Sequence, residues 1–166
     1  MKLEDITLIV SATVTALMAG LFFSYSISVN LGLGKLTDTE YIKAMQSINR
    51  EIQNPLFFIC FFGALIMLPV ATLQQHNNNK ISFLFLLAVT IFYALGVFGM
   101  TVFANVPLNN QLDKFNPATA TLESISSMGS LFKNRWNFWN NIRTIASLLS
   151  IIFIICACLF RQDEIT

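Results

Sequence analysis

The chain has 166 residues, of which 55% are hydrophobic and only 11% are charged, and its formal net charge is +1. This composition excludes an ordinary soluble domain, because such a domain needs more polar side chains at its surface. It also excludes nucleic acid as a partner, because no block of lysine and arginine is present to neutralise phosphates. We therefore expect an all-α integral membrane protein that contacts membrane lipids.

Four apolar segments are each long enough to cross about 30 Å of hydrocarbon as a helix. They cover approximately residues 6–31, 56–73, 81–105 and 139–160. The first is too long for the apolar core of a signal peptide, and Glu4 and Asp5 interrupt the positive region that such a peptide requires. The sequence therefore predicts a single domain, residues 1–166, built as a bundle of four transmembrane helices.

The connection between the first two spans contains a helix pattern. Thr37 and Glu40 match a capping box, and apolar residues then recur at helical spacing. These residues are Tyr41, Met45, Ile48 and Ile52. The pattern predicts an amphipathic helix that either lies in the membrane interface or packs as a cap on the spans.

The connection between the third and fourth spans runs from Pro107 to about Asn137 and is predicted as a long, partly helical loop. In an up-and-down arrangement it lies on the same side of the membrane as the first connection. That side carries more basic residues than the other, so the positive-inside rule predicts that both long loops are cytoplasmic. The basic residues compared are Lys35, Lys43, Arg50, Lys114, Lys133 and Arg135 against Lys2, Lys80 and Arg161.

One face of the fourth span is polar and aromatic. At about 100° per residue, a single sector of the helix contains Trp136, Trp139, Asn140 and Arg143. A charge at this depth is costly unless it reaches the interface, lines a wet cavity or finds a partner. Arg143 is therefore the first candidate for a functional residue.

Polar groups of the other spans end at the same membrane surface. In the first span, Ser24 and Ser28 continue a stripe of small residues, with Tyr25 beside them. The third span ends at Asn105 and is followed by Asn109. These positions predict a polar pocket in which asparagine carbonyls, serine hydroxyls and a ligand satisfy the five donors of the guanidinium of Arg143.

Each of these features also has a structural alternative. The small-residue stripe is typical of close helix packing, and tryptophans at a membrane boundary commonly form an aromatic belt. Arg143 could extend to lipid headgroups or pair with Glu51 or Asp113 from the loops. No cofactor or metal is expected, because the single histidine, His76, has no cluster of carboxylates beside it.

Four stretches of the sequence carry a family resemblance. "AGLFFSYSISVNLGL", "EYIKAMQSINREIQNPLF", "NVPLNNQL" and "RWNFWNNIRT" together resemble the anthrone oxygenase-like family of small four-span membrane proteins. Most bacterial members of this family are known only as a domain of unknown function. Its fungal members oxidise an anthrone to an anthraquinone with dioxygen, without a known metal or flavin. The motif positions of the family correspond to Asn105, Pro107, Asn109, Trp136, Asn140 and Arg143.

The resemblance implies an oxygenase that acts on a hydrophobic, enolisable aromatic of the anthrone, quinol or phenol type. Arg143, Asn109 and Asn140 would stabilise the oxyanion of the substrate. The substrate-binding residues would be Trp136, Trp139, Ser24, Ser28, Tyr25 and Asn105. A general base is missing from the spans, where only Tyr25 and Tyr93 titrate, so Glu51 or Asp113 would have to fold in.

Two other functions stay open at this point. The protein could bind a quinone or lipid without turning it over, or it could be a structural subunit in which Arg143 contacts a partner helix or a loop carboxylate. A homo-oligomer is compatible with all three functions. The bacterial members of the family suggest the inner membrane of a bacterium as its location.

Overall fold

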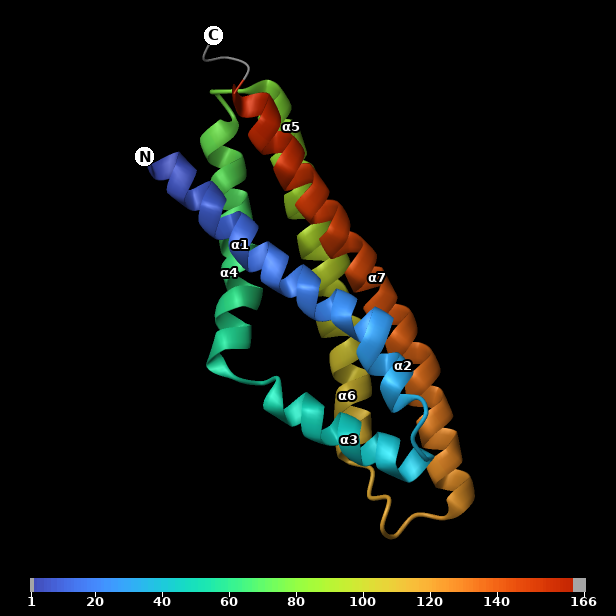
Figure 1. Ribbon diagram of the computed structural model, residues 1–166. Coiled ribbons are helices and arrows are strands. Elements are labelled where there is room, and N and C mark those ends of the chain that lie inside the picture. The colour runs from blue at the N-terminus through green and yellow to red at the C-terminus, as the bar shows by residue number, and fades with distance from the viewer. Residues whose placement is uncertain (1, 163–166) are drawn as a thin grey trace.

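The computed structural model describes residues 2–162, and within them the chain is entirely helical apart from short turns and connections (Figure 1). Four helical runs of this region are long and apolar enough to cross a membrane, which confirms the predicted all-α membrane class. They are Leu3–Leu33, Pro55–Gln75, Lys80–Asp113 and Leu122–Arg161. The spans predicted from the sequence lie inside these runs.

Two of the long runs contain π-helical segments. The first consists of α1 (Leu3–Ser24), η1 (Tyr25–Val29) and α2 (Asn30–Leu33). The third consists of α5 (Lys80–Ile91), η2 (Phe92–Gly99), η3 (Thr101–Asn105) and α6 (Val106–Asp113). A π-helical turn holds more residues than an α-helical turn, so it changes which side chains face inward, and such segments are frequent at functional sites.

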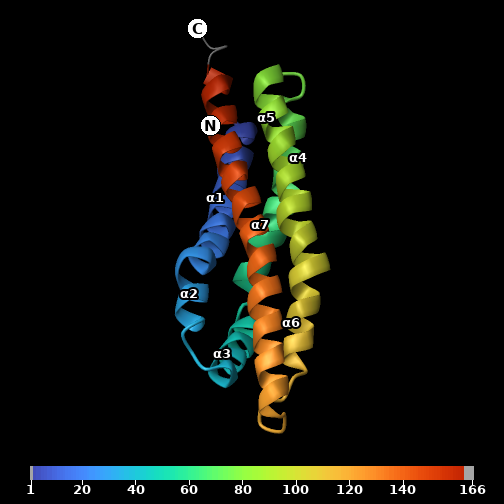
Figure 2. The ribbon, with the colours of Figure 1, turned by 90° about the vertical axis from the view of Figure 1, so that its right-hand side faces the viewer.

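The long helices pack around an apolar interior. α1 contacts both α4 (Pro55–Gln75) and α7 (Leu122–Gln162), and α5 also contacts α4 and α7. Leu86, Val89 and Val97 on the third run have no exposed surface. Both described ends of the chain and the α4–α5 turn lie at one end of the molecule, whereas α3 (Asp38–Glu51) and the α6–α7 connection lie at the other (Figures 1 and 2).

The amphipathic helix predicted between the first two spans is α3. Its capping box is formed, because the backbone N–H of Glu40 donates to Thr37 Oγ1 at 3.4 Å and the backbone N–H of Thr37 donates to Glu40 Oε2 at 3.0 Å. The Thr37 hydroxyl also donates to this carboxylate and holds the pKa of Glu40 below its ordinary value. The cap therefore forms with ionised Glu40.

The apolar face of α3 packs on α6 and on the beginning of α7, so it covers the ends of the long helices. Ile42 and Met45 have no exposed surface. Gln46 Nε2 donates to the carbonyl oxygens of Leu112 and Phe115 at 2.8 and 2.7 Å. Of the two alternatives for this helix, packing as a cap is the one that the structure supports.

The long loop predicted between the third and fourth spans is wrong in extent. The third run continues as a helix to Asp113, and α7 begins at Leu122, so only residues 114–121 connect them. Pro107 is the second residue of α6 and directly follows the π-helical segment η3, so the N–H that proline lacks falls where the hydrogen-bond pattern of the run changes. α7 is consequently 41 residues long and extends well past the predicted span.

Candidate functional site

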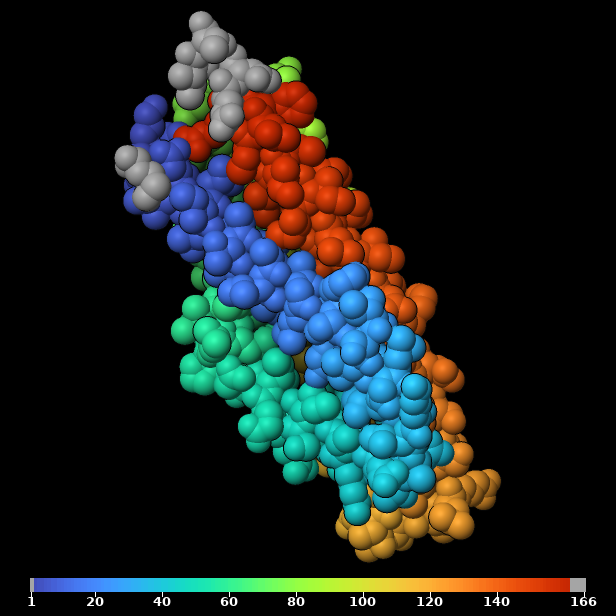
Figure 3. Space-filling view, in the orientation of Figure 1, coloured from blue at the N-terminus to red at the C-terminus, as the bar shows by residue number. Residues whose placement is uncertain are grey.

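A cavity of about 280 Å³ lies near the α3 end of the molecule, between α1, α3, α4, the η2–η3–α6 segment and α7. This volume is close to the lower end of the range of small-molecule sites, about 300–1,000 Å³. Figure 3 shows the face on which α1 and the α3–α4 segment lie over the site. Its aromatic lining consists of Phe22, Tyr25, Phe57, Phe58, Phe61, Phe62, Phe98 and Trp136, and its polar lining of Asn49, Gln53, Thr101, Asn105, Asn109, Asn110, Asn140 and Arg143.

Arg143 is the one charged residue of this lining, and only 6% of it is exposed. Its Nη1 donates to Thr101 Oγ1 at 3.2 Å and its Nη2 donates to Asn140 Oδ1 at 2.9 Å. Its Nε is buried and donates to none of residues 2–162. The guanidinium is therefore held by neutral groups, and its Nε–H is a donor without a partner among the described residues.

Asn140 is fully buried and links α7 to α1. Its Nδ2 donates to the carbonyl oxygen of Phe22 at 3.3 Å and to Ser26 Oγ at 2.9 Å, while its Oδ1 accepts from Arg143. Ser26 Oγ also contacts Thr144 Oγ1 at 3.0 Å. This network fixes the position of the arginine, because every polar atom of the Asn140 side chain is used.

Aromatic rings surround the guanidinium. Its central carbon lies 4.5 Å from the ring centre of Phe22 and 5.4 Å from that of Trp136. Tyr25 contacts Trp136 with ring centres 5.5 Å apart, and Trp136 Nε1 donates to Asn109 Oδ1 at 2.8 Å. The negative faces of aromatic rings stabilise a cation but cannot neutralise its charge.

The cavity opens between α4 and the η3–α6 segment. Phe58 and Phe62 of α4 and Val102 and Val106 on the opposite side line the cavity, and each is 37–45% exposed. α4 packs against α1, α5 and η2, which leaves its beginning apart from η3 and α6 (Figure 1). The site therefore has a polar inner wall, and its exposed lining is apolar at these four residues and polar at Gln53 and Asn110.

No aspartate or glutamate in residues 2–162 lines the cavity. Asp113 pairs with Arg50 at 2.8 Å, and Glu51 is exposed on α3. The structure does not support the alternative in which Arg143 pairs with either carboxylate, because its hydrogen-bond partners are Thr101 and Asn140. Tyr93 is also outside the lining, since its hydroxyl donates to the carbonyl oxygen of Phe61 at 3.0 Å.

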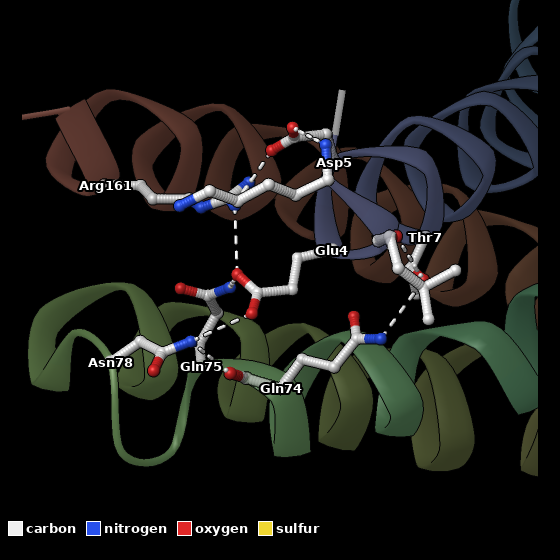
Figure 4. A network of polar contacts seen from close by, with 9 residues as sticks. Glu4, Asp5, Thr7, Gln74, Gln75, Asn78 and Arg161 are labelled. Atoms are coloured by element: carbon white, nitrogen blue, oxygen red, sulfur yellow. Dashed lines mark hydrogen bonds and ion pairs between the residues drawn. The ribbon is translucent and has the colours of Figure 1, made fainter.

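The opposite end of the molecule shows how this chain neutralises another arginine. Arg161 Nη2 lies 2.8 Å from Asp5 Oδ1 and 3.2 Å from Glu4 Oε2 (Figure 4). Gln75 and Asn78 also donate to Glu4. These groups line a broader recess of about 710 Å³. Here Arg161 is neutralised by two carboxylates, unlike the cation of the smaller cavity.

Six of the predicted site residues meet at the smaller cavity: Tyr25, Asn105, Asn109, Trp136, Asn140 and Arg143. Three do not, namely Ser24, Ser28 and Trp139. Ser24 Oγ donates to the carbonyl oxygen of Leu21 in its own helix, and Ser28 is exposed. Trp139 lies at the edge of the sector that holds Arg143 and packs against Phe138.

The first span has two stripes of small or polar residues, and the sequence alone does not distinguish which of them packs inward. Ser11 and Thr15 of one stripe are buried and Ser26 is half-buried, whereas Gly20 and Ser28 of the other are exposed. Hydroxyl groups on the exposed face can bond to their own helix, as Ser24 does, so polarity alone does not indicate the packed face.

Thr101 and Ser26 were not among the predicted site residues, although both contact the network around Arg143. Thr101 could have been noticed in the sequence as a hydroxyl-bearing residue inside the otherwise apolar third span. Its direction depends on the π-helical segments η2 and η3, which a constant 100° per residue does not describe.

The comparisons with known proteins agree with this architecture. A family model described as Anthrone oxygenase matches residues 43–153, about two thirds of the chain. No curated protein and no solved structure matches the chain. The matched region contains α4, the third helical run, and the residues Asn105, Asn109, Trp136, Asn140 and Arg143. The chain therefore belongs to the anthrone oxygenase family.

Proposed function

We propose that the protein binds a hydrophobic, enolisable aromatic of the anthrone, quinol or phenol type in this cavity and oxidises it with dioxygen. The observation that supports this most directly is the buried Arg143, whose side chain is held by neutral groups at the wall of an aromatic cavity. Removing a cation from water costs on the order of several kcal/mol, and an anionic ligand would recover part of this cost. An aromatic oxyanion satisfies both the cation and the rings.

The chemistry requires stabilisation of negative charge on oxygen. An anthrone has a carbonyl across the ring from an acidic methylene, so loss of a proton gives an aromatic enolate. Arg143 Nε and the Nδ2 of Asn109 would donate to this oxygen, because Asn109 already uses its Oδ1 to accept from Trp136. Donors held in place before the reaction stabilise developing charge without reorganisation.

The enolate would then react with dioxygen directly. The enolate first passes one electron to dioxygen. The carbon radical and superoxide then combine to form a carbon–oxygen bond at the former methylene carbon, and a proton completes the hydroperoxide. Loss of water breaks the O–O bond and the remaining C–H bond at that carbon, which gives the quinone. One anthrone and one dioxygen thus yield one anthraquinone and one water.

The residues that line the cavity limit which group can remove the proton of the substrate. Since no described carboxylate lines the cavity, the site favours a ligand that enters as its oxyanion or that loses its proton to water. Tyr25, which lies against Trp136, lines the cavity, whereas Glu51 and Asp113 do not.

Oxygen uptake by the protein in lipid nanodiscs, with anthrone as substrate, tests this proposal. We expect Arg143→Gln to lower the rate by about 100-fold or more, as the loss of one oxyanion donor does in other enzymes. Arg135→Gln is the matched control, because Arg135 is exposed two turns earlier on α7 and should leave the rate unchanged.

An equal rate in the wild type and in Arg143→Gln would exclude the proposed role of the arginine. Tight binding of anthrone that depends on Arg143, together with no uptake above empty nanodiscs, would instead favour a protein that holds its ligand without oxidising it.

A further inference from the structure

The polar wall of the cavity contains one acceptor that is not used. Asn105 is 1% exposed, and its Oδ1 accepts no hydrogen bond from the described residues. Buried polar atoms of side chains normally have a partner, so an unpaired one at a cavity wall indicates where a ligand donates.

The orientation of the Asn105 amide is fixed by its neighbour. Its Nδ2 donates to the carbonyl oxygen of Trp136 at 3.3 Å. Because a carbonyl oxygen can only accept, the nitrogen must face Trp136, and the amide cannot be turned around without losing this bond. Oδ1 therefore stays without a donor among the described residues, in a side chain that lines the cavity.

Three other side-chain acceptors of the cavity wall already have donors. Asn140 Oδ1 and Thr101 Oγ1 accept from Arg143, and Asn109 Oδ1 accepts from Trp136. Asn105 Oδ1 is thus a buried acceptor of this wall that still lacks a donor. Arg143 has the opposite role, because its unpaired Nε–H can only donate and would therefore bind a carbonyl oxygen or an oxyanion of the ligand.

We infer that Asn105 is a specificity-determining residue that selects aromatic ligands with a hydroxyl group in addition to the oxygen held by Arg143. Two separate contacts, one accepting and one donating, would fix the orientation of a flat ring in the cavity. An aromatic ketone without the hydroxyl leaves Asn105 unpaired, and a methyl ether offers it no proton. This inference rests on the proposed function only in requiring that the cavity holds an aromatic ligand.

The test measures binding of ligands that differ in one group. Anthraquinone, its 1- and 2-hydroxy derivatives and the matching methyl ethers are titrated into protein in nanodiscs, at a pH where the hydroxyl stays protonated. Quenching of the Trp136 emission reports binding in a Trp139→Phe background, because Trp139 lies outside the cavity. A site that binds a hydroxyl discriminates strongly against ligands without one. We expect at least one hydroxy isomer to bind roughly tenfold or more tightly than both anthraquinone and its ether.

Two variants separate this role from general packing. Asn105→Leu should bring the affinities for the hydroxy, ether and parent compounds to within about twofold of one another. Asn110→Leu is the matched control, because Asn110 is an exposed asparagine of the same lining on α6, and it should keep the preference for the hydroxyl.

Equal binding of all compounds by the wild type would overturn the inference and leave the proposed function intact, and it needs no variant to be folded. A preference that persists in Asn105→Leu would also overturn it. If none of the compounds binds, the proposed function itself fails, and the inference fails with it.

Discussion

At the scale of single residues, the site depends on how Arg143 is held. Its two terminal nitrogens each have a neutral acceptor, Thr101 Oγ1 and Asn140 Oδ1, and two rings lie beside its central carbon. Neutral acceptors position the guanidinium but leave its charge available to a ligand. A carboxylate in the same place would neutralise the cation, as Glu4 and Asp5 do for Arg161.

Thr101→Val tests the contribution of one of these acceptors. Valine keeps the shape of threonine but leaves Arg143 Nη1 without an acceptor, so the free energy of unfolding should fall by about 1–3 kcal/mol. Unfolding in mixed micelles with an increasing fraction of SDS, followed by tryptophan emission, measures this change.

The control for this substitution is Thr13→Val. Both threonine hydroxyls donate to the carbonyl oxygen four residues earlier in their own helix, and only that of Thr101 also accepts from an arginine. Thr13 is exposed, and its substitution should change stability by less than about 0.5 kcal/mol. Equal effects at the two positions would mean that the bond to Arg143 contributes nothing measurable.

At the scale of helices, the third run and α7 pack closely at Gly96. A Cβ atom at Gly96 would lie 2.5 Å from the Cβ of Ala146 on α7. A Cβ at Gly20 would meet no heavy atom within 4 Å. Gly20 precedes Ser24 and Ser28 in the small-residue stripe of α1, so the structural alternative of close packing for this stripe is not supported at Gly20, and the glycine that does permit close approach is Gly96 in η2.

Gly96→Ala should lower the free energy of unfolding by about 1–3 kcal/mol, because the extra methyl group forces the two helices apart. The second change Ala146→Gly should restore most of this loss by removing the atom that clashes. Gly20→Ala provides the control and should be neutral. If the double variant is no more stable than Gly96→Ala alone, the cost arises from the backbone of η2 and not from contact with α7.

Much of the site could be predicted because α7 is a regular helix throughout. A constant rotation per residue places Trp136, Asn140 and Arg143 on one face, and the structure agrees. The prediction was less accurate where helices are irregular or uniformly apolar. Thr101 follows a π-helical segment that changes the rotation, and α1 has polar residues on two faces.

The ends of the helices were harder to predict for a different reason. Proline and asparagine after Asn105 are typical of loops, yet they occur within the helical turns of α6, which packs against α3 and α7. Tertiary contacts of this kind determine where a helix ends, and composition does not record them. By contrast, Thr37 and Glu40 interact within one turn, so the start of α3 was predictable from the sequence.

At the scale of the whole molecule, the two ends differ in whether their arginine is neutralised by carboxylates. One end pairs Arg161 with two carboxylates, and the other keeps Arg143 beside a cavity that opens past Phe58, Phe62, Val102 and Val106. Because α4 begins at Pro55, its two phenylalanines lie within the first turns of a helix long enough to span the membrane. This opening suits a ligand that is dissolved in lipid.

The anthrone pKa, measured without oxygen, tests most directly whether the cavity binds an oxyanion. Anthrone is titrated with base under anaerobic conditions in nanodiscs with and without the protein, and the absorbance of its enolate is followed. The account predicts that the enolate forms about one pH unit lower or more with the protein, and that Arg143→Gln abolishes this shift while Arg135→Gln keeps it. An unchanged or higher pKa of anthrone in the wild-type protein would contradict the account.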